Sequence, residues 1–298
     1  MYIGNLALKF NIKGGGINHG MKNAMAPMDD QTMLVGIDVT HPSPGSNAAA
    51  PSVAGVVANT DRYLAQWPAS IRRQEGRKEM VTDLGDMIGE RLELWRKKNQ
   101  QRLPNKVIVY RDGVSEGQFQ LVLDQELPGF HNAFKKFYGD KAKWPKMAVI
   151  VVSKRHHTRF YPTSSTDANS RNFNPLPGTI VDRGVTDAYL YDFFLQAHSG
   201  LQGSAKPARY VVIKDELGFE ANALENFTHN LCYMFNRATK AVSICPPAYY
   251  ADLLCERARM YLFSTLNEPL GSEFGDDSGE AEWDGTIHPR IRESTFYI

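Results

Sequence analysis

The chain has 298 residues, of which 42% are hydrophobic, and carries a formal charge of +1 at pH 7. This length is enough to bury a sizeable core within one large domain. The three cysteines, Cys232, Cys245 and Cys255, show no CxxC spacing, so neither zinc nor a disulfide framework is indicated. No hydrophobic run approaches the roughly 20 residues of a membrane span, and no signal peptide is visible. We therefore expect a reducing, intracellular setting and no membrane partner.

The charge is unevenly distributed along the chain. Every charged side chain of residues 268–284 is acidic, and the glycine and serine content of this segment predicts a mobile acidic loop. The remainder of the chain is correspondingly basic, which favours binding to a polyanion.

The first element covers residues 5–13, which read equally well as a helix or a strand. Lys9 and Lys13 are four residues apart and share a face in either case, and glycines at 14–16 end the element. Two lysines beside a glycine turn are able to hold a phosphate, although solvated surface lysines are the commoner arrangement.

Residues 33–39 form a short hydrophobic run, which predicts a strand buried on both faces. Asp38 interrupts this run. A buried charge without a partner is costly, so Asp38 should become protonated or meet a cation such as a metal ion. The alternative is an ordinary strand that ends in a capping aspartate.

Two further strands are predicted at residues 52–58 and 62–67, and three strands at such short spacing suggest an antiparallel meander. A basic connection follows, and then a helix. The basic residues are Arg72, Arg73, Arg77 and Lys78. The hydrophobic positions of the helix recur at helical spacing: Met80, Leu84, Met87, Ile88, Leu92 and Trp95.

The next buried strand, residues 107–110, leads to Asp112 and a glycine turn. In open α/β sheets the functional crevice lies at the carboxyl ends of the strands. Asp38 and Asp112 are therefore expected to share a divalent metal there. Further acidic ligands are sought among Glu79, Glu90 and Glu93, although most glutamates on helices are merely solvated.

The following helix places Phe119, Val122, Leu123 and Leu127 inward and is expected to end at Pro128 and Gly129. Residues 147–152 then predict a buried strand that leads into the basic segment 154–159. Such a segment suits contact with a nucleic-acid backbone, and a solvated basic loop is the alternative.

The last third of the chain begins with a loop at 161–177, followed by strands at 189–195 and 209–213 with a glycine-bearing loop between them. A helix then shows Leu224, Phe227, Leu231 and Met234 at helical spacing. After two prolines, the last helix carries on one face Tyr250, Leu253, Leu254, Ala258 and Tyr261. Asp252 lies off that face.

Three strands, a helix and a fourth strand, with acids in the first and at the fourth, resemble the ribonuclease H-like fold, an α/β mixed sheet flanked by helices. Four motifs go further: GIDVTHP (36–42), YRDGVSEGQF (110–119), KRHHTR (154–159) and PAYYA (247–251). They resemble the PIWI domain of eukaryotic Argonaute proteins, in the family's order, and a filamentous-fungal member is expected. The resemblance implies one PIWI domain over residues 1–298, in which residues 1–30 connect to a middle domain outside the chain.

This family cleaves RNA opposite a small guide strand and uses an acidic tetrad that holds divalent metal. The resemblance assigns the catalytic tetrad to Asp38, Glu79, Asp112 and Asp252, with the three aspartates as metal ligands. Animal members usually carry histidine at the position of Asp252, but aspartate is an acceptable oxygen ligand for Mg²⁺. Hard oxygen ligands suit Mg²⁺ or Mn²⁺, and two ions about 4 Å apart would activate water and stabilise the leaving oxygen. His41 and His157 are then structural or backbone-contacting residues.

The same resemblance implies contacts to the guide. Lys9, Lys13 and Arg257 would hold its 5′ phosphate, near the carboxylate of Ile298. A longer set matches positions that contact the guide backbone: Arg155, His157, Arg159, His198, Lys206, Arg237, Ser243 and Tyr249. Because some relatives have arginine at position 206, a bidentate contact is not expected there. Such contacts position the strand, and base pairing supplies specificity.

The implied partners are a small guide RNA, its complementary target RNA, and the middle, PAZ and N-terminal domains of a full-length chain. Relatives also bind proteins with tryptophan motifs, but no residue pattern here marks such pockets. The expected location is cytoplasmic. Two other functions stay open: a guide-holding scaffold that does not cut, and a transposase-like or integrase-like enzyme that acts on DNA. The complete acidic set weighs against the first, and the motifs at 154–159 and 247–251 weigh against the second.

Overall fold

The computed structural model describes residues 2–20, 25–46, 50–200, 202–262 and 286–298. The acidic loop expected at 268–284 lies outside these residues. Within them, no helix combines the length and the hydrophobicity that crossing a membrane would require.

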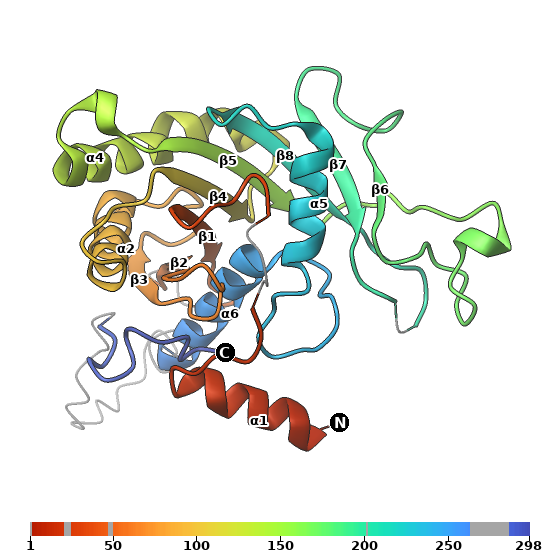
Figure 1. The fold of residues 1–298 in the computed structure, drawn as a ribbon, viewed down its shortest axis with the longest axis horizontal. Coiled ribbons are helices and arrows are strands. Elements are labelled where there is room, and N and C mark those ends of the chain that lie inside the picture. The colour runs from red at the N-terminus through yellow and green to blue at the C-terminus, as the bar shows by residue number, and fades with distance from the viewer. Residues whose placement is uncertain (1, 21–24, 47–49, 201, 263–285) are drawn as a thin grey trace.

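The described residues form an eight-stranded mixed sheet in the order β3-β2-β1-β4-β5-β8-β7-β6 (Figure 1). The strands are β1 Thr32–Thr40, β2 Ser52–Ala58, β3 Ala69–Gln74, β4 Lys106–Asp112, β5 Lys146–Ser153, β6 Thr179–Val181, β7 Tyr191–Gln196 and β8 Ala208–Asp215. Strands β1, β4 and β5 are parallel neighbours, and every other pairing is antiparallel. This is the mixed sheet that the sequence predicted.

Helices cover both faces of the sheet (Figure 1). The α-helices are α1 Tyr2–Lys13, α2 Leu84–Lys98, α3 Phe119–Leu121, α4 Leu127–Tyr138, α5 Ala221–Leu231 and α6 Pro246–Tyr261. Shorter turns are the 3₁₀ segments η1 Glu116–Gln118, η3 Lys141–Lys143 and η4 Ser165–Asp167, and the π-helical segment η2 Val122–Glu126. One hydrophobic core lies between the sheet and helices α2 and α4, and the other lies between the sheet and helices α5 and α6.

Alternation along β1 decides which way its aspartate points. Met33, Val35 and Ile37 belong to the core beneath α2 and α4, whereas Leu34 belongs to the core beneath α6. Successive side chains of a strand point to opposite faces. Asp38 therefore shares the face of Leu34 and points toward α6.

Two glycines allow α6 to cross directly over β1 and β2. A Cβ atom on Gly36 would lie 1.9 Å from the carbonyl oxygen of Pro247, and one on Gly55 would lie 2.9 Å from Cys255 Sγ. No side chain fits at such a close approach. This contact carries Asp252 of α6 toward the end of β1.

The antiparallel meander is confirmed, but the third strand lies elsewhere than predicted. Residues 62–63 form a turn and 64–67 are irregular, and β3 occupies Ala69–Gln74, which includes Arg72 and Arg73 of the predicted basic connection. The carboxylate of Asp61 accepts hydrogen bonds from the backbone N–H groups of Tyr63, at 2.8 Å, and Gln66, at 3.3 Å. This side-chain capping stabilises a turn in place of a strand.

The helix predicted to end at Pro128 and Gly129 continues to Tyr138. The chain is already helical before Pro128, so the missing N–H of this proline interrupts the helical hydrogen-bond pattern, and the interruption falls where the π-helical segment changes to α4. The π-helical segment Val122–Glu126 directly precedes it and buries Glu126. A buried acid at this point is absent from the sequence-based prediction.

The C-terminal residues return to the beginning of the sheet. The backbone N–H of Trp67 donates to Thr295 Oγ1 at 2.8 Å, and the Tyr297 hydroxyl donates to the carbonyl oxygen of Trp67 at 2.8 Å. Trp67, Tyr250 and Tyr297 are all buried in the same core. The last described segment thus completes the core beneath α6.

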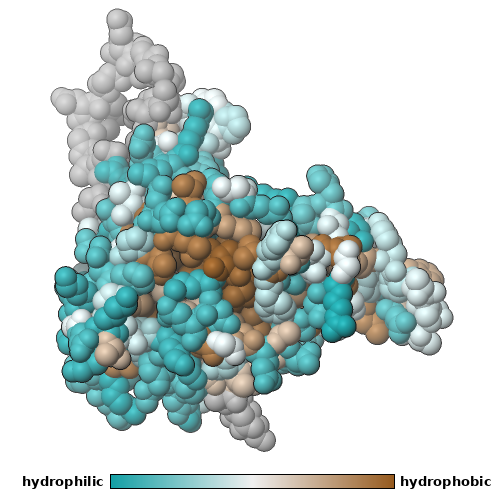
Figure 2. Space-filling view, turned by 90° about the horizontal axis from the view of Figure 1, so that it is seen from above, coloured by the Kyte–Doolittle hydropathy of each residue, from teal (hydrophilic) through white to brown (hydrophobic). Residues whose placement is uncertain are grey.

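Hydrophobic side chains also remain at the surface. Seen from above, they gather in the middle of the molecule and hydrophilic residues surround them (Figure 2).

Helix α1 carries a separate set of exposed hydrophobic residues. On α1, Tyr2 and Ile3 are 79% and 80% exposed, and Phe10 is exposed on the same helix. The outward face of α1 is therefore hydrophobic and uncovered by the described residues.

Candidate functional site

Three aspartates from three elements meet at the carboxyl ends of the central strands. The parallel register pairs Gly36 of β1 with Tyr110 of β4, so Asp38 and Asp112, two residues further on, stand on adjacent strands. Gly36 and Tyr110 face α6. Side chains two residues apart on a strand share a face, so Asp38 and Asp112 also point toward α6. Asp252 of α6 completes the group and interacts electrostatically with both strand aspartates.

The electrostatics of these carboxyls reflect burial and crowding. Burial raises the pKa of Asp38 well above its usual range, and the charges of Asp112 and Asp252 raise it further. Burial also raises the pKa of Asp112, although the Gly113 N–H and nearby guanidinium groups oppose the shift. Burial, Glu256 and Asp112 raise the pKa of Asp252 to about 6. Full ionisation of the three groups is thus costly unless a cation joins them.

Glu79 enters the same site from the segment between β3 and α2. A Cβ atom on Gly113 would lie 3.0 Å from Glu79 Oε1 and 3.2 Å from Asp38 Oδ1, so the two carboxylates border the same small space. Glu79 Oε2 is 2.8 Å from His41 Nε2, and the other nitrogen of that ring is 2.8 Å from Ser52 Oγ. The structure therefore brings all four predicted acids together.

Two residues that hold Glu79 in place were missed by sequence reasoning: Arg111 and Glu126. Arg111 is 0% exposed and donates to Glu79 Oε1 at 2.9 Å and to the Glu79 carbonyl at 2.8 Å. Its Nε and Nη2 donate to Glu126 at distances from 2.8 to 3.2 Å, and Glu126 Oε1 accepts from the Val81 N–H at 3.0 Å. The available signal was an arginine at the end of an otherwise hydrophobic strand.

The ion pairs of Arg111 keep it charged. Burial acts to lower the pKa of Arg111, but Glu126 and Glu79 raise it above its ordinary value. A permanently charged, buried guanidinium fixes both carboxylates through several hydrogen bonds at once. The loop that carries Glu79 is therefore anchored to the sheet rather than left mobile.

The four carboxylates fit a divalent ion in chemistry, although their oxygens have not converged. Among the described residues, no three acidic, histidine or cysteine side chains are close enough together to ligate one ion. Carboxylate oxygens are the donors that Mg²⁺ and Mn²⁺ prefer. Like charges repel in the absence of a cation, so ligation of one ion by three of these carboxylates requires their side chains to rearrange.

These pKa shifts predict how the metal-free protein responds to pH. A carboxyl whose pKa is raised on folding stabilises the protein below its unfolded pKa of 3.8, and this contribution is lost as pH rises through the folded value, about 6 for Asp252. We expect metal-free Asp252→Asn protein to gain stability relative to wild type between about pH 4 and pH 7. Mg²⁺ should stabilise wild type more at pH 7 than at pH 5.

Urea unfolding at several pH values, with EDTA or with Mg²⁺, measures both effects. The exposed Asp86→Asn variant is the control, because its carboxyl lies on the surface of α2. A stability difference between wild type and Asp252→Asn that stays constant across this pH range would contradict the assignment.

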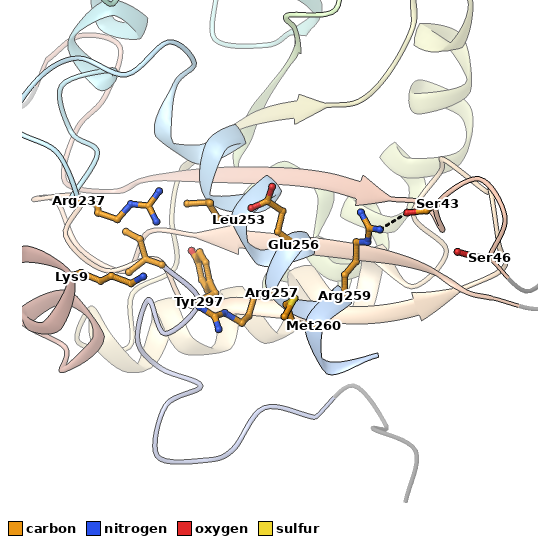
Figure 3. Close-up of a pocket in the computed structure, with 11 residues that line it drawn as sticks. Lys9, Ser43, Ser46, Arg237, Leu253, Glu256, Arg257, Arg259, Met260 and Tyr297 are labelled. Atoms are coloured by element: carbon orange, nitrogen blue, oxygen red, sulfur yellow. Dashed lines mark hydrogen bonds between the residues drawn. The ribbon is translucent and has the colours of Figure 1, made fainter. Parts of the chain in front are cut away.

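A second cluster surrounds a cavity of about 560 Å³ farther along α6 (Figure 3). Lys9 of α1, Arg257 of α6, Arg237 and Ile298 line it. Lys13 belongs to the same group, because its Nζ donates to the Phe296 carbonyl at 2.7 Å. Burial, followed by the charges of Arg257, Lys9 and Arg237, lowers the pKa of Lys13. Glu256 also lines the cavity, but basic side chains outnumber it, so the cavity is electropositive and suited to an anion.

The residues expected along a guide backbone fall in separate places. Arg237 lines the cavity of Figure 3, and its guanidinium lies 5.4 Å from the centre of the Phe235 ring. The ring of Tyr249 stacks on the ring of Phe235, with ring centres 4.7 Å apart. Arg155 lies beside the acidic group, where its charge opposes the rise in the pKa values of Asp112 and Asp252.

Lys154 interacts with three of the other residues expected along the guide backbone: Ser243, Lys206 and His198. The sequence indicated Lys154 only as part of the basic segment. Its Nζ donates to Ser243 Oγ at 2.5 Å. Burial and then Lys206 lower the pKa of Lys154. Burial and Lys154 lower the pKa of His198 to about 4, so this imidazole is neutral at pH 7. Lys154, His198, Lys206 and Ser243 thus form one polar cluster.

The two remaining residues lie in the loop after β5. Arg159 Nη1 donates to the carbonyl oxygens of His156 and Thr158, at 3.2 and 2.7 Å, and thereby shapes its own loop. His157 is exposed on that loop. It is free to face a ligand, whereas Arg159 already has structural partners.

Acidic side chains at the carboxyl ends of adjacent central strands, under a helix that supplies another acid, define the class of ribonuclease H-like α/β proteins with a candidate metal site. Residues 1–262 match the family model described as the Piwi domain. The chain therefore belongs to the Piwi domain family, to which Argonaute proteins belong.

Known relatives agree with this assignment. Protein argonaute 2 and Protein argonaute 3 of Oryza sativa subsp. japonica are each 43% identical to the chain over 87% of its length. The matches cover 25% and 23% of those proteins, so the chain spans about a quarter of the relatives' length. The predicted filamentous-fungal origin stays a prediction.

Solved structures confirm the fold. The crystal structure of Kluyveromyces polysporus Argonaute with a guide RNA covers 100% of this chain, and 36% of that chain, at 30% identity and a TM-score of 0.86. The N. crassa QDE-2 AGO MID-PIWI domains match at 33% identity and a TM-score of 0.65, over 100% of this chain and 67% of that one. The ribonuclease H-like architecture predicted from sequence is thus shown.

Proposed function

We propose that this chain is the guide-directed endoribonuclease module of an Argonaute protein and acts in RNA silencing. The carrying observation is the meeting of Asp38, Asp112 and Asp252, whose pKa values are all raised, with Glu79 held at the edge of the same space. Ionising all these carboxyls costs free energy without a cation, and the same carboxylates can bind a catalytic metal ion.

In this proposal the three aspartates bind Mg²⁺ or Mn²⁺, and Glu79 completes the set. Two bound ions would supply an activated water and stabilise the leaving oxygen of an RNA phosphodiester. Arg111 and His41 orient the Glu79 carboxylate, as their hydrogen bonds to it indicate. Arg155, whose charge acts on Asp112 and Asp252, would contact a phosphate beside the acids.

The electropositive cavity supports binding of a guide 5′ phosphate by Lys9, Lys13 and Arg257, with Arg237 beside them. The cluster around Lys154 would follow the guide backbone, and base pairing would select the target RNA. The uncovered hydrophobic face of α1 supports a connection of residues 1–30 to a middle domain. The proposal also includes PAZ and N-terminal domains, tryptophan-motif partners and a cytoplasmic location. These three parts rest only on membership of the family.

Metal removal tests the proposal directly. We expect the full-length protein, loaded with a 5′-phosphorylated guide, to cut a fully paired RNA target once and at one position in Mg²⁺ or Mn²⁺. Excess EDTA should abolish the product while guide stays bound, because the acids lie apart from the phosphate cavity. A single-turnover assay with labelled target measures both. A loaded protein that yields no product in either metal is a scaffold, and preferential cleavage of DNA favours a transposase-like enzyme.

A further inference from the structure

A second cavity, of about 570 Å³, opens between the edge strand β3, helix α2 and residues 286–293. None of its described lining residues lines the cavity of Figure 3 or belongs to the acidic cluster. Its walls combine hydrophobic residues, Ile71, Leu94 and Ile287, with basic ones. The basic residues are Arg72, Arg91, Lys97 and Arg292.

Arg91 stands out because it is buried without an adequate partner. Its side chain is 8% exposed, and its Nε and Nη1 have no hydrogen-bond acceptor. The Glu90 carboxylate approaches only Nη2, at 3.7 Å, which is too far for a hydrogen bond. Burial lowers the pKa of Arg91 to about 10. A buried cation with unsatisfied N–H groups is costly, and an anionic acceptor would remove that cost.

The carboxylates around the cavity are already engaged. Glu90 accepts hydrogen bonds from Arg72 and from Ser70. Glu293 is shared by Lys97, at 2.7 Å, and Lys98, at 3.0 Å.

The third acid that lines the cavity, Glu93, pairs with Arg96 at 2.8 Å. The guanidinium of Arg292 is exposed and forms no hydrogen bond or ion pair within the part of the chain that is described. Four basic and three acidic side chains of the described residues line the cavity, and Glu93 pairs with Arg96 outside the lining, so positive charge remains in excess there.

We propose that this second cavity is a binding site for a phosphate group, with Arg91 as its principal ligand and Arg72 and Arg292 as secondary ligands. The planar guanidinium fork binds two phosphate oxygens at once. Arg91 lines the cavity, and the proposal requires its guanidinium to reorient so that the buried Nε and Nη1 meet the phosphate. The hydrophobic wall accommodates an organic group that carries the phosphate.

Titration with phenyl phosphate tests this site without any guide or target RNA, so its outcome is independent of the proposed nuclease function. The full-length protein carries Arg257→Met throughout, to weaken phosphate binding in the cavity of Figure 3. We expect Arg91→Leu to lower the affinity at least about tenfold, because two charge-assisted hydrogen bonds are lost.

Arg292→Gln supplies a variant that leaves the buried core untouched, and it should lower the affinity about threefold. Arg290→Gln is the matched control, since Arg290 is exposed two residues away and does not line the cavity. Inorganic phosphate should bind more weakly than phenyl phosphate, and benzoate should bind more weakly than either. Free phosphate binding as tightly as the ester identifies inorganic phosphate as the ligand.

The proposal is overturned if phenyl phosphate binds wild type and Arg91→Leu equally, or if it does not bind at all. Equal affinities for Arg292→Gln and Arg290→Gln would remove Arg292 from the site. Arg91→Leu replaces a buried unpaired charge with a hydrophobic group, so we expect it to fold. Circular dichroism before each titration verifies that point.

Discussion

Asp112→Ala should abolish target cleavage by the full-length protein while leaving guide loading unchanged. Asp112 ends β4 beside Asp38 and interacts electrostatically with Glu79 and Asp252. A metal ion in a nuclease site contributes several kcal/mol of transition-state stabilisation, so loss of a ligand should slow cleavage about 10³-fold or more. The phosphate cavity lies elsewhere on α6, so loading should not depend on this carboxylate.

Single-turnover cleavage rates and guide-binding affinities, measured on the same preparation, test this expectation. Asp86→Ala is the matched control, because it removes an exposed aspartate from α2. Cleavage by Asp112→Ala at the wild-type rate would show that the acidic cluster is not the active site. A parallel loss of guide binding would indicate that the residue acts through folding.

Replacing both Lys9 and Arg257 with methionine should weaken binding of a 5′-phosphorylated guide far more than binding of a 5′-hydroxyl guide. Both residues line the cavity of about 560 Å³, one from α1 and the other from α6 (Figure 3). A hydrogen bond to a charged group contributes about 1.5–3 kcal/mol, so each substitution should cost roughly 10- to 100-fold in affinity. Lys13 and Arg237 remain and should preserve residual binding.

Equilibrium binding of the two guides to the full-length protein separates this effect from general electrostatics. Loss of basic charge anywhere on an RNA-binding surface weakens both guides to a similar extent. The exposed Arg290→Met variant provides that baseline. If the double variant weakened both guides equally, the cavity would not be the 5′-phosphate site.

The sequence predicted the elements that bring the aspartates together, because hydrophobic runs and helical spacing depend on local order. Strands β1 and β4 and helix α6 lie where their hydrophobic patterns indicate, and neighbouring parallel strands bring Asp38 and Asp112 to one edge. The position of Glu79 came from the family resemblance. Nothing in the spacing of residues 75–81 distinguishes this glutamate from a solvated one.

What the sequence did not reveal depends on contacts between distant residues. Arg111 is buried because Glu126 and Glu79 neutralise it, and this pairing exists only once the π-helical segment packs against β4. The strand predicted at 62–67 fails because a single side chain, that of Asp61, binds the backbone of the turn. The hydrophobic pattern of the sequence predicts neither the burial of Arg111 nor the capping of the turn by Asp61.

The return of the C-terminal residues to Trp67 bears on the order in which the protein is made. Trp67 is hydrogen-bonded to Thr295 and Tyr297, which follow it by 228 and 230 residues. On the ribosome, all four acids are translated before these partners emerge, yet the core beneath α6 still lacks its closing side chains. In a nascent chain Trp67 therefore stays without these partners until residues 295–297 have been synthesised, which makes it a target for chaperones. A premature stop codon just after α6 would spare every proposed metal ligand and still leave the domain open.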